Sequence, residues 1–248
     1  MNMLREEYLR RLTNESYLEI YLSSNCGARI YWPWRMQTPK EASTRYRNAC
    51  EKYIIDSDFA DEEVKNEDVL DCAFKVNADI AVLSDVYQDS AGTINAVLKG
   101  VEIYENHLFE GDLLIPLQQP YDECYSSLSD TGHYFGLGGI KNKNANKKLE
   151  LIKDFRDTVG YAPNLHGFGM GISDELAYEL QQEPRLLDSI DYSTPVQSNI
   201  MNVDNGKERM SVVAMRAATQ LVEDLRRVTP NVTHTIRDEE QNGLEAYQ

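Results

Sequence analysis

Short apolar runs that end in polar or glycine residues, each followed by a helix-forming stretch, recur along this chain of 248 residues. Runs of this length, rich in aromatic and branched side chains, are typical of buried strands. The predicted strands are residues 17–22, 53–55, 80–83, 113–117, 134–137, 165–168 and 187–191. An aromatic stretch at residues 30–34 is interrupted by Pro33, which leaves the count at seven or eight.

Stretches with apolar residues at helical spacing separate these runs. The predicted helices are residues 1–15, 60–76, 91–109, 121–128, 145–159, 174–182 and 208–228. Strand and helix alternate at the spacing of βαβ units, which gives a parallel sheet, either open or closed. A closed sheet fits better because each predicted strand ends in a residue suited to a site. We therefore predict a single α/β domain, a (β/α)8 TIM-type barrel over residues 1–228, followed by a polar tail over residues 229–248.

Composition excludes several classes of protein. No apolar run approaches the ~20 residues of a membrane-spanning helix, and the amino-terminal stretch is charged and amphipathic, unlike a signal peptide. No GxGxxG or P-loop motif marks a nucleotide cofactor site. The cysteines are far apart and lack zinc-ligand spacing; they are Cys26, Cys50, Cys72 and Cys124. These features predict a cytoplasmic protein with free thiols, no metal, no cofactor and no membrane partner.

The formal net charge is −16, which argues against indiscriminate binding to nucleic acid because phosphate contacts need Lys and Arg. Two segments depart from this acidic average. Residues 29–52 and residues 141–156 each contain six basic residues against two acidic ones. These two basic islands are either solvated faces or surfaces that contact phosphate. Likewise, the two tryptophans of residues 30–34 are core residues or, if one is exposed, a surface on which bases stack.

Four predicted strand ends carry a carboxylate or amide side chain: Asp56, Asp85, Gln118 and Asp191. A single strand-end aspartate is more often a helix cap or turn residue than a catalyst, but four on different units are harder to explain as caps. Two carboxylates that face each other in a partly dry pocket have their pKa values pushed apart, so one serves as a nucleophile while the other handles protons. Such a pair suits glycosyl transfer or proton abstraction.

Glycines and one histidine mark two further strand ends. Gly136, Gly138 and Gly139 indicate a close approach of the backbone, either to a flat ligand or to a neighbouring element of the fold. His166, in the sequence LHGFGMG, is either a site residue or a histidine whose hydrogen bonds are satisfied inside the barrel.

The order of these motifs resembles that of the queuine and archaeosine tRNA-guanine transglycosylases. It is more similar still to their phage and viral relatives, which insert 7-deazaguanines into DNA. The resemblance covers residues 53–195. It implies that Asp56, followed by Ser57, is the proton-handling aspartate. It also implies that Asp191 is the nucleophile, because IDY stands here where the family has an FDC strand end.

The same resemblance implies a set of purine-binding residues. Asp85 of VLSD would contact the guanine edge, and Gln118 of IPLQ would contact the base. The family's Gly-Gly-Leu turn is similar to the turn Gly138-Gly139-Ile140, whose backbone groups would meet the heterocycle. We add His166 as a candidate for substrate binding.

The chain departs from the family in two ways, of which the first concerns the shape of a loop and the second bears on the substrate. The chain has SDF at residues 57–59 where the family has Ser-Gly-Gly, and it lacks the cysteine-rich zinc-binding subdomain of the tRNA enzymes, which favours DNA. The expected activity exchanges guanine in DNA, flipped or single-stranded, for a free 7-deazaguanine base through a covalent aspartyl-glycosyl intermediate. A viral protein of this kind would act in the host cytoplasm. The alternatives are a tRNA-guanine transglycosylase, a small-molecule TIM-barrel hydrolase or lyase with an Asp/Asp pair, and a binding protein without turnover.

Overall fold

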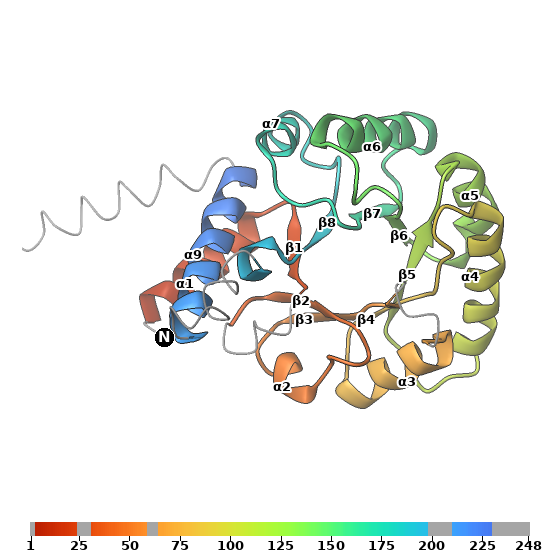
Figure 1. Cartoon of the computed structure of the whole chain (residues 1–248), viewed down its shortest axis with the longest axis horizontal. Helices are drawn as coiled ribbons and strands as arrows, with labels where there is room; N and C mark the ends of the chain where they lie inside the picture. Colours follow the sequence, from red (N-terminus) through yellow and green to blue (C-terminus); the bar gives the residue numbers. More distant parts are fainter. Residues whose placement is uncertain (1–2, 24–30, 59–63, 198–209, 230–248) are drawn as a thin grey trace, which may run out of the picture.

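The protein is a closed barrel of eight parallel strands, seen in a computed structural model that describes residues 3–23, 31–58, 64–197 and 210–229. Each strand pairs with the next along the chain, and the last pairs with the first (Figure 1). The strands are β1 Glu19–Leu22, β2 Trp34–Gln37, β3 Lys52–Ile55, β4 Ile80–Val82, β5 Asp112–Leu117, β6 Tyr134–Leu137, β7 Asn164–Gly167 and β8 Ser189–Tyr192. The predicted (β/α)8 barrel is confirmed. Residues 230–248 of the predicted tail lie outside the described residues.

Helices surround the barrel, and α1 and α9 lie side by side next to β1 (Figure 1). The helices are α1 Met3–Glu15, α2 Thr44–Arg47, α3 Asn66–Val76, α4 Ser90–Tyr104, α5 Tyr121–Leu128, α6 Ala145–Val159, α7 Asp174–Gln182 and α9 Met210–Val228, with a 3-10 turn at Ser129–Thr131. Side chains of Asp89, Asn144 and Ser173 accept N–H groups in the first turns of α4, α6 and α7. Such caps fix where a helix begins. In the described part of the chain no helix is both long and apolar enough to cross a membrane.

Strand β2 was not predicted, although it completes the barrel between β1 and β3. The strand starts directly after Pro33, and its side chains are all buried. Trp32 and Trp34 are 1% and 7% exposed, and the indole N–H of Trp32 donates to the Ile20 carbonyl at 2.7 Å. Both tryptophans therefore belong to the core, and the alternative that one of them stacks on bases is wrong.

The pairing register determines which side chains point into the barrel. Tyr21 of β1 lies opposite Asp191 of β8, and Gly136 of β6 lies opposite His166 of β7. Because side chains alternate between the faces of a strand, Ser189 points to the same side as Asp191. Polar side chains of β7 and β8 therefore line part of the barrel interior, and they extend to Asp191 near the carboxyl ends of the strands.

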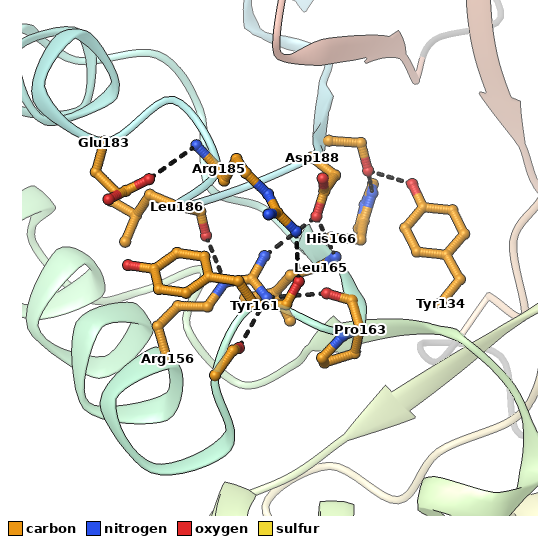
Figure 2. A network of polar contacts seen from close by, with 12 residues as sticks. Tyr134, Arg156, Tyr161, Pro163, Leu165, His166, Glu183, Arg185, Leu186 and Asp188 are labelled. Atoms are coloured by element: carbon orange, nitrogen blue, oxygen red, sulfur yellow. Dashed lines mark hydrogen bonds and ion pairs between the residues drawn. The ribbon is translucent and has the colours of Figure 1, made fainter.

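The opposite end of the barrel is held by a buried guanidinium, that of Arg156 on α6 (Figure 2). It donates to the carbonyls of Leu186 at 3.0 Å and Pro163 at 2.9 Å, and to the Asp188 carboxylate at 3.1 Å. The same carboxylate accepts the N–H of Leu165 at 2.7 Å. Arg156 therefore ties α6 to the chain entering β7 and β8.

Replacing this guanidinium should be costly. Arg156→Ala removes the partner of several buried carbonyls, so the free energy of unfolding should fall by about 3 kcal/mol or more. Lys153→Ala is the matched control on the same helix. It breaks a more exposed pair with Glu179, and such pairs contribute about 0–1 kcal/mol. Urea unfolding of the two variants tests this, and equal losses would contradict the role given to Arg156.

Candidate active site at the barrel mouth

The predicted carboxylates come together at the carboxyl ends of the strands, the end at which TIM-barrel enzymes carry their active sites. Asp56 follows the last residue of β3, and Asp191 is the third residue of β8. Asp85 and Gln118 follow β4 and β5. Asp191 and Asp85 both act electrostatically on Asp56, so the three carboxylates share one region. None of the three is fully buried.

Asp191 is held through one of its two carboxylate oxygens. Its Oδ1 accepts the N–H of Gly169 at 2.5 Å and lies 3.6 Å from Nε2 of His166. Among the described residues, no other residue is seen to donate a hydrogen bond to Oδ2, although the N–H of Asp191 itself also acts on the carboxyl. The side chain is 22% exposed and thus reaches the mouth of the barrel. One oxygen is therefore fixed by the protein while the other is left for a ligand.

The same contacts set the charge of Asp191. Burial alone would raise the pKa of its carboxyl, but the interaction with His166 and the N–H of Gly169 outweigh burial, so the pKa lies below its ordinary value. Asp191 is therefore a carboxylate at neutral pH, as a nucleophile must be.

Asp56 has the opposite character. Burial, and then the charges of Asp191, Asp58 and Asp85, raise the pKa of Asp56 to about 7, and the N–H of Ser57 offsets only part of this rise. A group with this pKa is present in both protonation states at neutral pH, which suits a general acid and base. The two aspartates thus have separated pKa values, as expected for a nucleophile and a proton-handling partner.

Asp85 and Gln118 form a second pair. The Gln118 amide Nε2 donates to Asp85 Oδ2 at 2.5 Å, and its Oε1 accepts the N–H of Gln88 at 3.2 Å. Burial raises the pKa of Asp85, and the hydrogen bond from Gln118 partly counters it. The pair is oriented by these bonds, and each side chain keeps hydrogen-bonding capacity for a ligand.

The glycines of this region make room for protein side chains. A Cβ at Gly138 would lie 2.4 Å from Nε2 of Gln118, and one at Gly139 would lie 2.9 Å from its Oε1. A Cβ at Gly136 would lie 2.2 Å from the ring of Phe168. Of the two interpretations of these glycines, close packing against the protein therefore accounts for all three without a ligand.

Three more candidate residues lie at or below the mouth. Ile140 and Ser57 are buried, at 0% and 5% exposure, so neither presents an open surface at the mouth. His166 is 0% exposed and lies inside the barrel, where its Nδ1 is 2.6 Å from Ser189 Oγ. Its Nε2 is buried without a hydrogen-bond partner. His166 contacts Asp191 rather than the surface, so its effect on a substrate would pass through that carboxylate.

Sequence reasoning missed Lys148, whose ammonium lies beside this network. Its Nζ donates to the carbonyls of Gly169 at 2.7 Å and Met170 at 3.0 Å, which fixes the loop that binds Asp191. Burial lowers the pKa of Lys148, and the charge of Asp191 partly restores it. The position of this lysine on the buried face of the predicted helix could have indicated its role, but the residue was counted as part of a basic island.

Several residues of the two basic islands are buried or paired away from the mouth. Arg35 is fully buried with its guanidinium over the Tyr46 ring. Near the amino ends of the strands, Arg47 pairs with Asp79 and Lys52 pairs with Glu19. Arg156 and Lys148 are also buried, as described above, and Arg29 lies outside the described residues. Lys141 is exposed and lies against Gly169, which leaves it near the site.

Within the described residues, no three or more His, Cys, Asp or Glu side chains are grouped so that they could hold a metal ion. Cys50, Cys72 and Cys124 are free, and Cys26 lies outside the described residues. The described side chains at the mouth include the carboxylates of Asp56, Asp85 and Asp191 and the amide of Gln118.

Fold and site together define a TIM-barrel protein with an unequal pair of carboxylates at its mouth. No model of a known protein family matches the chain, and no curated protein matches it. Among solved structures, the YdjI aldolase from Escherichia coli K12 is similar, with a TM-score of 0.59 and 13% identity over 94% of this chain and 98% of that one. A protein assigned as a fructose-1,6-biphosphate aldolase from Coccidioides immitis gives a TM-score of 0.58 and 11% identity, over 90% and 93% of the two chains. At these identities the similarity shows the shared barrel fold.

The raised pKa of Asp56 makes stability depend on pH. An unfolded aspartate titrates near 3.9, so the folded state binds the extra proton between about pH 4 and pH 7 and loses stability as pH rises through that window. Asp56→Asn should therefore raise the free energy of unfolding by roughly 2–4 kcal/mol at pH 8 and leave it nearly unchanged at pH 4. Urea unfolding at both pH values measures this, with the exposed Asp112→Asn as control. Stabilisation that is equal at pH 4 and pH 8 would rule out the raised pKa.

Proposed function

We propose that the protein is an enzyme that exchanges guanine in DNA for a 7-deazaguanine base, with Asp191 as nucleophile and Asp56 as proton-handling residue. The observation that carries this proposal is the separation of the two pKa values at one barrel mouth. Asp191 is ionised, and Asp56 is close to half-protonated at neutral pH. The resemblance of the motifs to the guanine transglycosylases supplies the substrate class.

In the proposed reaction, Oδ2 of Asp191 attacks C1′ of the deoxyribose while the bond from C1′ to the guanine nitrogen breaks. Asp56 gives its proton to the leaving base and becomes a carboxylate. The incoming 7-deazaguanine then loses its ring N–H proton to Asp56, and the ring nitrogen attacks C1′. The bond from C1′ to Asp191 breaks, which returns both carboxyl groups to their starting states.

The purine itself would be bound by the second pair of side chains. An ionised Asp85 can accept the N1–H and 2-amino groups of guanine in parallel, and Gln118 or the N–H of Gly139 can donate to the 6-oxo group. A base inside a duplex cannot enter a barrel mouth, so the target would be flipped out or single-stranded.

The loop after Asp56 gives further support. Asp58 stands where the transglycosylases have a glycine, and its φ is 52°, in the left-handed region that glycine adopts at low cost. Asp and Asn are among the residues that tolerate this region. The departure in sequence at Asp58 therefore keeps a backbone shape of the kind that glycine permits.

A second candidate is a small-molecule barrel lyase or hydrolase that uses Asp56 to abstract a proton. Two observations favour it. Five residues of the basic islands are buried or paired away from the mouth, which removes part of the predicted phosphate-contacting surface; they are Arg35, Arg47, Lys52, Lys148 and Arg156. The similar solved structures are described as aldolases. Such an enzyme would not retain DNA, whereas a transglycosylase should retain it in a salt-sensitive way.

The test is incorporation of radiolabelled guanine into a single-stranded, guanine-containing oligodeoxynucleotide. Wild-type protein should incorporate label, and Asp191→Asn should lose at least a thousandfold in rate because the amide cannot form the glycosyl ester. Asp112→Asn, at the exposed amino end of β5, is the control and should keep full activity.

Two outcomes contradict the proposal. Turnover by Asp191→Asn would show that Asp191 is not the nucleophile. Absence of incorporation by folded wild-type protein would show that the protein does not catalyse this exchange. A tRNA substrate run in parallel separates the two nucleic acids. Mass spectrometry of the wild-type protein with the oligonucleotide should also show an adduct that is absent from Asp191→Asn.

A further inference from the structure

Three polar side chains form a continuous chain inside the barrel, and Figure 2 labels two of them, Tyr134 and His166. The phenol of Tyr134 on β6 is hydrogen-bonded to the hydroxyl of Ser189 on β8. The same hydroxyl lies 2.6 Å from Nδ1 of His166 on β7. Ser189 and His166 are 0% exposed, so in this region bulk water does not compete for these groups.

The direction of the chain follows from its first member. Tyr134 keeps its proton, since burial raises the pKa of the phenol. Its hydroxyl needs an acceptor, and in the described part of the chain that acceptor is Ser189. If Ser189 instead donated to Tyr134, the phenol proton of this half-buried residue would have no acceptor in the described part of the protein, which is unfavourable. Ser189 must then donate its own proton to His166, so Nδ1 is an acceptor and the ring proton sits on Nε2.

This assignment places a proton on the other ring nitrogen, Nε2, which faces Asp191. Nε2 has no hydrogen-bond partner and lies 3.6 Å from Oδ1 of Asp191. An Nε2–H is attracted to that carboxylate, whereas an unprotonated Nε2 would place a lone pair against its negative charge. The contact is slightly long for a hydrogen bond, so a small movement of Asp191 on binding a ligand would close it.

We infer that Tyr134 and Ser189 are positioning residues that hold His166 as the neutral Nε2–H tautomer, which directs a donor at the oxygen of Asp191 that does not react. Together with the Gly169 N–H, this donor would engage Oδ1 and leave Oδ2 as the attacking atom. The role of the chain in catalysis rests on the proposed function, but the tautomer of His166 does not.

Aromatic rings surround the remaining edges of the His166 imidazole. Three aromatic rings contact it edgewise, those of Tyr21, Tyr134 and Phe168, at centroid distances of 6.2, 6.4 and 4.6 Å. Of the described acidic side chains, Asp191 is the one within ion-pair distance of the ring. Of these neighbours, Tyr21 directs its hydroxyl to Glu19 at 2.6 Å, outside the chain.

Nitrogen NMR of protein labelled with 15N-histidine tests the tautomer directly. The sequence has four histidines, so loss of one set of signals in His166→Gln assigns the resonances. At pH 7, wild-type His166 should show a protonated Nε2 and an unprotonated Nδ1. Ser189→Ala should convert this to a mixture of tautomers, and Tyr134→Phe should shift the spectrum less but in the same direction.

Two comparisons separate a chain from general packing effects. Tyr21→Phe is the matched control, because this tyrosine contacts the same ring but lies outside the chain, and it should leave the His166 tautomer unchanged. Adding Tyr134→Phe to Ser189→Ala should change nothing further, since Tyr134 acts through Ser189. An Nδ1–H tautomer or an imidazolium in wild-type protein would overturn the inference. So would equal shifts in Tyr21→Phe and Tyr134→Phe.

Activity then reports the catalytic consequence separately. Ser189→Ala should slow guanine incorporation about tenfold, with KM nearly unchanged, because a donor to a charged group is lost. The acid limb of the pH profile should move to higher pH, since loss of that donor raises the pKa of Asp191. If wild-type protein shows the Nε2–H tautomer but incorporates no guanine, the proposed function fails and the inference on the chain stands.

Discussion

Burial of like charges at one end of a barrel is the constraint on which this site depends. Desolvation disfavours both the Asp56 and the Asp191 carboxylates, and the charge of Asp191 makes Asp56 harder still to ionise. In this protein the hydrogen-bond donors are placed mainly around Asp191. Asp191 has the Gly169 N–H and the nearby ring of His166, whereas Asp56 has the N–H of Ser57 and three acidic neighbours. The surroundings of the two carboxyl groups therefore give them different pKa values.

The fold could largely be predicted because its strands are apolar runs, and the exceptions have physical causes. Strand β2 was missed because its sequence, WRMQ, carries Arg35 and Gln37, two polar residues that are nevertheless buried. The predicted helix over residues 91–109 ends early at Tyr104, where the chain turns and the ring of His107 accepts the N–H of Phe109. The first case depends on tertiary burial that a local pattern does not contain, and the second on a local turn that interrupts an otherwise helical pattern.

The candidate site, like the fold, could be predicted only in part. Strand-end positions identified Asp56, Asp85, Gln118 and Asp191, because parallel strands of a barrel deliver their carboxyl ends to one place. The partners that give these residues different properties could not be found, since Gly169 and His166 are separated from Asp191 by more than 20 residues along the chain. The glycines were informative about close packing, but the sequence could not show that Gln118 and Phe168 are what they accommodate.

Asp58 affects both the backbone shape of its loop and the electrostatic surroundings of Asp56. Its left-handed backbone would suit glycine better, yet the side chain places a third negative charge near Asp56 and contributes to the raised pKa of that residue. A glycine at this position would relax the turn and also leave Asp56 more acidic. The chain thus keeps a residue with a mildly unfavourable backbone conformation next to Asp56, and the pKa of the Asp56 carboxyl is set partly by the charge of this neighbour.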